Sequence, residues 1–170
     1  MSTFSKSISV YAWSRMQPYP SVNPASAIPI RHTAVIQNLM LTRGQPDREQ
    51  FVVALLNAKN NIIGLNIVSV GVLLSAPVHP RKVLKPAMLV NSSAMILCHN
   101  HTSNDISSST DDLVVTRKII KAADIIGIQV HNYLIIDIEN ERFFSFADEG
   151  IIQKIYDDIL PLFPDICNYA

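Results

Sequence analysis

The chain has 170 residues, which is enough for one domain with a buried core. Hydrophobic residues make up 48% of the sequence and charged residues 16%, and this balance excludes a globally disordered chain. The formal net charge is zero, so no overall field directs the protein to nucleic acid or to a membrane.

The charges are distributed unevenly along the chain. Residues 1–104 carry nine Lys and Arg and only two acids, Asp47 and Glu49, whereas residues 105–170 carry five bases and twelve acids. A basic half can contact phosphate, so DNA is kept as an alternative partner. The two cysteines form no disulfide framework, and no apolar stretch approaches the ~18 residues that cross a bilayer. We therefore expect a cytoplasmic protein without a membrane partner.

The chain begins with a region of low regularity. Residues 1–30 are rich in Ser and Pro ("QPYPSVNPASAIP") and are expected to form an extended or flexible arm. Residues 31–170 are expected to form a single domain. Its first element is a helix in which Val35, Ile36 and Leu39 recur at helical spacing before Gly44.

Two apolar, β-branched runs follow, at residues 51–57 and 62–70. The stretch "NAKNN" divides them, and Asn-rich stretches favour turns, so the pattern predicts a β-hairpin. Pro80 suits the first turn of the next helix, "PRKVLKPAMLVNSS". Pro86 inside this segment predicts a kink or a late helix start.

The second half alternates between strands and helices. "AMILC" is a short apolar run that predicts a buried strand leading into His99. "DDLVVTRKIIKAADIIG" has the periodicity of a helix, with Gly127 as its C-cap. "QVHNYLIID" and "RFFSFAD" predict two more strands, and the segment after Gly150 is helical up to Pro161. The order indicates an α/β fold around one mixed sheet.

Two histidines, His99 and His101, are one residue apart at the end of the "AMILC" strand. Side chains at i and i+2 of an extended segment point to the same side, so both imidazoles can reach one metal ion. Asp112, in the first turn of the following helix, is well placed as a third ligand. Two histidines and a carboxylate leave a fourth tetrahedral position open for water, as in hydrolytic zinc sites.

A purely structural interpretation fits the same residues. "STDD" also matches a capping box, with Ser109 as N-cap and Asp112 three residues later. The H-x-H spacing is common, and most such pairs bind nothing. The spacing alone therefore leaves both interpretations open. Cys98 should point away from His99 and into the core.

The stretch "HNHTSNDISSSTDD" resembles the JAMM signature of the JAB/MPN metallopeptidases, in which H-x-H is followed by seven residues, a Ser, two residues and an Asp. This register falls on His99, His101, Ser109 and Asp112. The flanking "VSVGVLLSAPVHPRKVLKPAM", "GIQVHNYLIID" and "FFSFADEG" are similar to the RadC-like branch of that superfamily. The resemblance covers roughly residues 45–150. It implies a three-layer, cytidine-deaminase-like α/β domain in which a mixed sheet is flanked by helices.

The sequence departs from the RadC-like pattern at four loop positions. That branch usually has Pro where Thr102, Ile106 and Ser108 stand, and Gly at Asn104. Asn tolerates a positive φ better than most residues, so Asn104 can keep the turn. The lost prolines should make ordering of the loop more costly in entropy. The family's helix-hairpin-helix DNA-binding module is not evident in residues 1–44.

The resemblance also implies a reaction, namely zinc-dependent hydrolysis of a peptide or isopeptide bond in a peptide or protein substrate. Zn²⁺ on His99, His101 and Asp112 would lower the pKa of a bound water to about 7. Glu49, the sole glutamate before the histidines, would act as general base, unless it is a solvated charge ahead of a strand. Ser109 would donate to the oxyanion or keep its hydroxyl for the helix cap. The alternative function is a non-catalytic or DNA-associated module with a role in DNA repair or mobile-element biology.

Overall fold

The computed structural model describes residues 16–17, 36, 48–71, 78–103 and 105–159. Its strands are β1 (Met16–Gln17), β2 (Gln50–Leu56), β3 (Ile62–Val70), β4 (Ala94–Asn100), β5 (Gln129–Asp137) and β6 (Arg142–Ser145). Its helices are α3 (Pro80–Leu89), α4 (Thr110–Ile125) and α5 (Ile151–Ile159). None of the helices in the described part of the chain is long and apolar enough to span a membrane.

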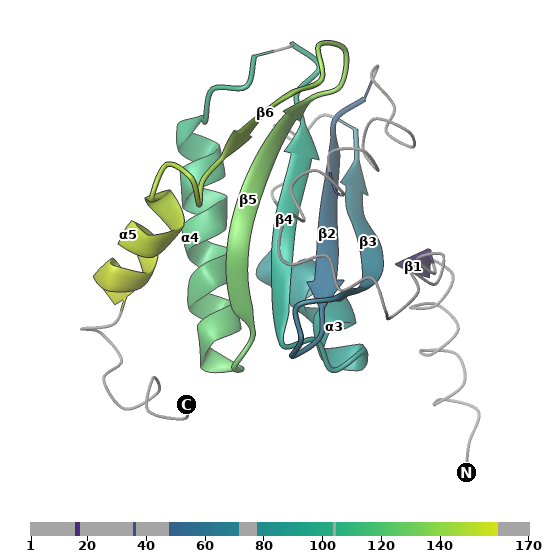
Figure 1. Ribbon diagram of the computed structural model, residues 1–170, viewed down its shortest axis with the longest axis vertical. Coiled ribbons are helices and arrows are strands. Elements are labelled where there is room, and N and C mark those ends of the chain that lie inside the picture. The colour runs from purple at the N-terminus through teal and green to yellow at the C-terminus, as the bar shows by residue number, and fades with distance from the viewer. Residues whose placement is uncertain (1–15, 18–35, 37–47, 72–77, 104, 160–170) are drawn as a thin grey trace.

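The strands form one mixed sheet in the order β1-β3-β2-β4-β5-β6. All neighbouring strands are antiparallel except β4 and β5, which are parallel. A parallel pair needs a crossover connection, and α4 supplies it (Figure 1). The chain therefore leaves the carboxyl end of β4 and enters the amino end of α4 at the same edge of the sheet, where the histidines lie.

The two faces of the sheet bury different residues. Buried side chains of α3, α4 and α5 pack in one cluster with alternate strand residues that include Phe51, Leu97 and Tyr133. The intervening residues, among them Val52 and Cys98, form a second cluster on the other face, together with Ile36. The fold is thus α/β, with the three described helices on one face of the sheet. As predicted, Cys98 lies in the core, and its burial raises the pKa of its thiol.

The predicted hairpin is confirmed as β2 and β3. Asn57 accepts hydrogen bonds from the backbone N–H groups of Lys59 and Asn61 at 2.9 and 3.0 Å, which closes the turn. Asn60 takes a positive φ of 58°, a conformation that Asn tolerates well. Asparagine side chains and backbone thus form the turn, as the composition of the segment predicted.

The helix predictions are confirmed in part. Helix α3 begins at Pro80 and continues through Pro86, so the expected late start is wrong. Helix α4 ends as predicted, with Gly127 in the left-handed conformation (φ 71°). Of the predicted helix near residues 31–44 only Ile36 is described, and most of the N-terminal arm lies outside the described residues, although Met16–Gln17 pairs with β3.

Candidate metal centre

Three polar side chains meet where β4 ends and α4 begins. His99 is the penultimate residue of β4, His101 follows the strand directly, and Asp112 is in the first turn of α4. One ligand atom from each of these residues lies within 4.8 Å of the other two. His99 Nε2 is 3.5 Å from Asp112 Oδ1, and His101 Nε2 is 3.9 Å from Asp112 Oδ2. The structure thus brings together the three residues named from the sequence.

The donor set fits a zinc ion. Ligands at about 2.0–2.1 Å from a tetrahedral zinc ion are separated from one another by about 3.3 Å. The two nitrogen–oxygen distances of 3.5 and 3.9 Å are only slightly longer. Two imidazoles and one carboxylate also leave a coordination position open. That His99, His101 and Asp112 bind a metal stays a prediction, but their geometry requires little movement.

The backbone of the loop fixes the tautomer of His101. Its Nδ1 contacts the backbone carbonyl oxygen of Asp105 at hydrogen-bonding distance. A carbonyl oxygen only accepts, so Nδ1 must carry the proton, and Nε2 keeps a lone pair. The Asp105 carboxylate in turn accepts from the backbone N–H and the hydroxyl of Ser107, both at 2.8 Å. Asp105 therefore shapes the loop through its carboxylate and orients His101 through its backbone carbonyl.

A tyrosine fixes the tautomer of His99. The hydroxyl of Tyr133 lies 2.7 Å from His99 Nδ1 and 3.0 Å from Asp112 Oδ1. An ionised carboxylate can only accept, so the single hydroxyl proton goes to Asp112, and Nδ1–H of His99 donates to the hydroxyl oxygen. Nε2 of His99 is left with its lone pair, on the side where Asp112 Oδ1 lies. Both histidines thus present unprotonated Nε2 atoms to the same carboxylate.

The electrostatics of the site favour the ligand forms. Burial lowers the pKa of His99 from 6.5 to about 3, although Asp112 opposes the shift, so the ring is neutral at pH 7. Burial by itself raises the pKa of Asp112. The charge of His99 in its protonated form and the hydrogen bonds from Ser109 and Tyr133 have the opposite effect and are stronger, so the pKa of Asp112 is lowered. Burial raises the pKa of Tyr133 well above 10, so its hydroxyl keeps the proton.

The capping box predicted from "STDD" is present. The backbone N–H and the hydroxyl of Ser109 donate to Asp112 Oδ2 at 2.8 and 2.6 Å, and the Ser109 hydroxyl accepts from the backbone N–H of Asp112 at 3.1 Å. The structural and the metal interpretations of Asp112 are therefore compatible, because its carboxylate serves the cap and still faces both histidines. The single hydroxyl proton of Ser109 is directed at Asp112 in this structure, so donation to an oxyanion would require the hydroxyl to turn.

Glu49 lies in the same pocket as the three candidate ligands. The pocket has a volume of about 350 Å³ and is lined by Glu49, His99, His101 and Asp112, among others. The charge of Glu49 also contributes to the raised pKa of Tyr133, which places the carboxylate near the site. The role of Glu49 as a base stays a prediction; its location agrees with that role.

Asn100 holds the backbone on both sides of Glu49. Its Oδ1 accepts from the backbone N–H of Gln50 at 2.9 Å, and its Nδ2 donates to the backbone carbonyl of Arg48 at 2.9 Å. Asn100 is buried, with 1% of its surface exposed. The residue between the two histidines thus ties the start of β2, and with it Glu49, to the end of β4.

One wall of the pocket comes from a stripe of α4. Val114, Val115 and Lys118 lie three, four and seven residues after Asp111, so the four share one side of the helix and all line the pocket, as does Val78. Leu113 and Val114, which have the apolar character of core residues, are 38% and 43% exposed. The exposed Val114 therefore belongs to the open wall of the pocket and not to the core.

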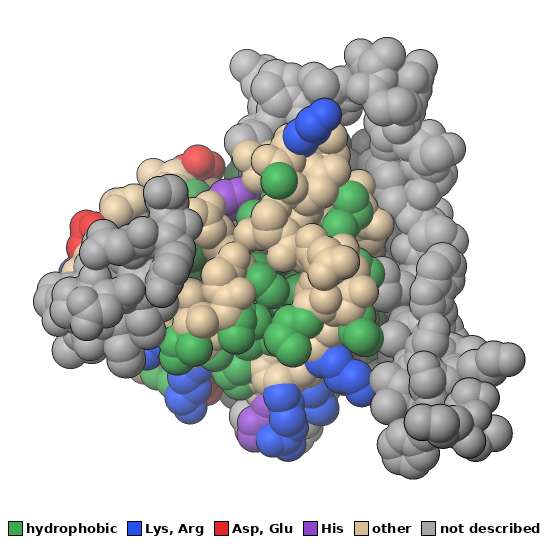
Figure 2. Space-filling view, turned by 90° about the horizontal axis from the view of Figure 1, so that it is seen from below, with side chains coloured by type: hydrophobic (Ala, Val, Ile, Leu, Met, Phe, Trp, Pro, Cys, Tyr) green, Lys and Arg blue, Asp and Glu red, His purple; other side chains and the backbone are tan. Residues whose placement is uncertain are grey.

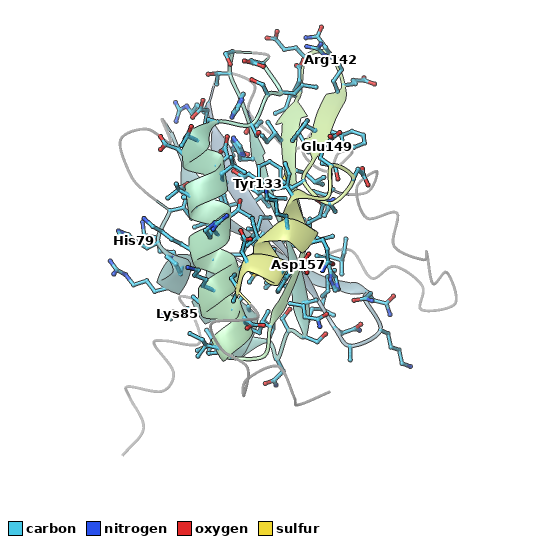
Figure 3. All side chains as sticks on the ribbon, turned by 90° about the vertical axis from the view of Figure 1, so that its left-hand side faces the viewer. His79, Lys85, Tyr133, Arg142, Glu149 and Asp157 are labelled. Atoms are coloured by element: carbon cyan, nitrogen blue, oxygen red, sulfur yellow. The ribbon has the colours of Figure 1, made fainter. Side chains whose placement is uncertain are left out.

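Two other described histidines lie elsewhere. His131 contacts Asn60 Oδ1 at 2.9 Å, which gives it a structural partner. His79 occupies the N-cap position of α3 without a side-chain cap bond, away from Tyr133 (Figure 3). Asn104 lies outside the described residues. Tyr133 and Asn100 were not identified from the sequence. The only signal for Tyr133 is a hydroxyl within an apolar strand, and the only signal for Asn100 is an amide at the end of a strand.

An α/β domain with two histidines and a carboxylate converging at a strand–helix junction has the features of a metal-site protein. The model of the RadC-like JAB domain matches residues 30–151, and the chain belongs to this family. The resemblance drawn from the sequence is thereby confirmed.

Several curated proteins are similar to the chain. A UPF0758 protein of Rubrobacter xylanophilus is 42% identical over 106 residues, which are 62% of this chain and 45% of that protein. The UPF0758 protein STH371 of Symbiobacterium thermophilum is 38% identical over 134 residues, which are 75% of this chain and 56% of that protein. The chain thus spans about half the length of the curated relatives it matches, and their names specify no activity.

Proposed function

We propose that the chain is a zinc-dependent hydrolase that cleaves peptide or isopeptide bonds. The observation that carries the proposal is the convergence of two unprotonated Nε2 atoms and one carboxylate, with Glu49 lining the same pocket. The Asp105 carbonyl and the Tyr133 hydroxyl keep both histidines in the ligand tautomer. If the two histidines had only structural roles, their Nε2 atoms would not need to face the same carboxylate.

Each residue has a separate task in this proposal. His99, His101 and Asp112 would hold the ion. When bound, zinc supplies Lewis acidity, which polarises a carbonyl group and makes a water molecule more acidic. Glu49 would accept a proton from the attacking water and pass it to the leaving amine. Ser109 would donate to the carbonyl oxygen as negative charge develops there, once its hydroxyl turns away from Asp112.

The pocket walls suit an extended peptide better than a small polar molecule. Val78, Val114 and Val115 form an apolar wall that can pack against a side chain next to the scissile bond. Lys118 adds a positive charge farther along the same helix. The substrate favoured by these walls therefore has an apolar residue beside the cleaved bond.

The substitution Glu49→Gln tests the proposed mechanism. Gln keeps the size of the side chain but cannot accept a proton, so hydrolysis of a peptide library by the zinc-loaded protein should fall about 10²–10⁴-fold. Zinc content and the folded state should stay those of the wild type, because Glu49 is not one of the three ligands. Glu139→Gln, an exposed change in the β5–β6 connection, is the matched control.

Cleavage by Glu49→Gln at the wild-type rate would contradict the assignment of the base. Loss of zinc together with activity would make Glu49 a ligand or a structural group. Cleavage of no peptide by the zinc-loaded wild type would contradict the proposed function as a whole.

A second candidate function is an association with DNA. One observation favours it: Arg81, Lys82 and Lys85 are all exposed on α3, and this helix contains no acidic residue. Figure 2, which views the molecule from below, shows Lys and Arg side chains gathered mainly along the lower edge of that face. Helix α3 precedes β4, and the candidate metal centre lies at the carboxyl end of that strand.

A further inference from the structure

Tyr133 occupies a rigid position in the middle of β5. The residue is 1% exposed, and its ring contacts Phe51 with centroids 6.0 Å apart and Phe146 edge-on at 4.8 Å. Figure 3 places it in the interior, between α4 and the sheet. The ring of His99 stacks on it at a centroid distance of 5.3 Å and an angle of 21°. The packing leaves the hydroxyl little freedom to move.

The hydroxyl of this fixed ring joins two candidate ligands that come from different elements. It accepts from His99 Nδ1 on β4 at 2.7 Å and donates to Asp112 Oδ1 on α4 at 3.0 Å. A buried tyrosine needs a partner for its hydroxyl, but a single acceptor in the core would satisfy it. Here the hydroxyl uses its one proton and one of its lone pairs on two residues that face the same point.

We propose that Tyr133 is a positioning residue of the metal centre, which holds His99 in the Nδ1–H tautomer and fixes Asp112 relative to it before the ion arrives. The inference rests on the metal site proposed above and deepens it. In this proposal Tyr133 acts through His99 and Asp112 and not directly on the ion or the substrate. Its contribution is to preorganise two of the three ligands, as outer partners of metal-binding histidines do in general.

The competing arrangement shows why the hydroxyl matters. Without it, Nδ1–H of His99 would be buried among aromatic rings with no acceptor among the described residues, at a cost of about 1–3 kcal/mol. The proton would then favour Nε2, which is 3.5 Å from Asp112 Oδ1 and can donate to it after a small shift. That tautomer places a hydrogen where the lone pair for the metal must be. Metal binding would have to reverse it, and affinity would fall.

The substitution Tyr133→Phe removes the hydroxyl alone, and Tyr156→Phe is a matched control. The hydroxyl of Tyr156 accepts from the backbone N–H of Val130 at 2.8 Å, away from the three ligands. Zinc affinity, measured by competition with a chromophoric chelator, should fall about 10–100-fold in Tyr133→Phe and stay unchanged in Tyr156→Phe. Both variants lose a tyrosine hydroxyl that is hydrogen-bonded, in Tyr156 at a half-buried position, so an unspecific effect of removing such a hydroxyl would appear in both.

A spectroscopic measurement on the zinc-free protein tests the tautomer itself. The ¹⁵N chemical shifts of the His99 imidazole should report Nδ1–H in the wild type and in Tyr156→Phe, and mainly Nε2–H in Tyr133→Phe. The wild-type measurement does not depend on whether any variant folds. An Nε2–H tautomer of His99 in the zinc-free wild type would overturn the proposal.

The outcomes separate this inference from the proposed function. Equal zinc affinity in the wild type and Tyr133→Phe would overturn the positioning role alone and leave the metal site in place. A wild type that binds no zinc would overturn the metal site and the positioning role together. A fall in affinity restricted to Tyr133→Phe, with the change of tautomer, would support both.

Discussion

Asn100 lies between the two histidines in the sequence, yet its side chain serves a different part of the site. Its amide bonds the backbone of residues 48 and 50 and so fixes the peptide segment that carries Glu49. Strand β4 thereby sets the position of the two candidate histidine ligands and of the candidate base. A base is effective only within hydrogen-bonding reach of the proton that it removes, so this clamp matters for the rate more than for metal binding.

We predict that Asn100→Ala retains zinc and loses hydrolytic activity about 10²-fold, because a displacement of about 1 Å at the base has an effect of that size. The matched control is Asn57→Ala, which removes two backbone contacts at the distant hairpin turn. Activity and metal content are measured on both variants. An Asn100→Ala protein as active as Asn57→Ala would show that the clamp does not position Glu49.

At the scale of elements, the junction between β4 and α4 builds most of the site. The alternation of β4 directs His99 to the helix-covered face and Cys98 to the other. The capping box starts α4 at Ser109, which places Asp112 at the third helical position, opposite the histidines. Local signals in the sequence specify both features, so this half of the site was predictable.

The same capping box leads to a stability prediction. Ser109→Ala should lower the free energy of unfolding by about 1 kcal/mol, whereas Ser109→Gly should lower it by only a few tenths, since Gly is tolerated at the N-cap. Urea unfolding of both variants measures the difference. Equal destabilisation by Ala and Gly would indicate that the hydroxyl stabilises the protein by a route other than the cap.

Because both variants lack the Ser109 hydroxyl, a loss of activity shared by Ser109→Ala and Ser109→Gly would support the role of that hydroxyl toward the oxyanion.

The contribution of Tyr133 could not be predicted from the sequence. It reaches His99 only because β4 and β5 pair in parallel with Leu97 opposite Tyr133, and this register depends on the crossover through α4. The partners of Asn100 likewise follow from the antiparallel pairing of β2 with β4. Contacts that depend on strand register across more than 30 residues leave no local periodicity in the sequence. A kink or a late start of α3 was also expected from Pro86, but the helix begins at Pro80 and contains Pro86.

At the scale of the whole molecule, the candidate centre and the basic side chains of α3 lie on the same, helix-covered side of the sheet. The centre lies at the carboxyl end of β4, and the exposed Arg81, Lys82 and Lys85 lie on the helix that precedes this strand. The zero net charge gives no general attraction to nucleic acid, so any DNA binding must come from a local patch.

If the basic side chains of α3 bind DNA, affinity should fall steeply with salt, because each neutralised phosphate releases counterions. Replacing Lys82 and Lys85 by Gln should reduce the slope of log K against log salt by about 0.9 per lost contact. Fluorescence anisotropy with a labelled duplex at several salt concentrations measures both effects. Absence of binding at low salt would remove the support for a DNA-associated function.

The central claim is that His99, His101 and Asp112 bind a zinc ion, and metal analysis tests it most directly. Purified protein, dialysed mildly and analysed by mass spectrometry for metals, should contain about one zinc per chain in the wild type and almost none in His101→Ala. His131→Ala, which alters a histidine bonded to Asn60 outside the site, should retain the zinc of the wild type. Stoichiometric zinc in His101→Ala, or a wild type that takes up no zinc when it is supplied, would contradict the claim.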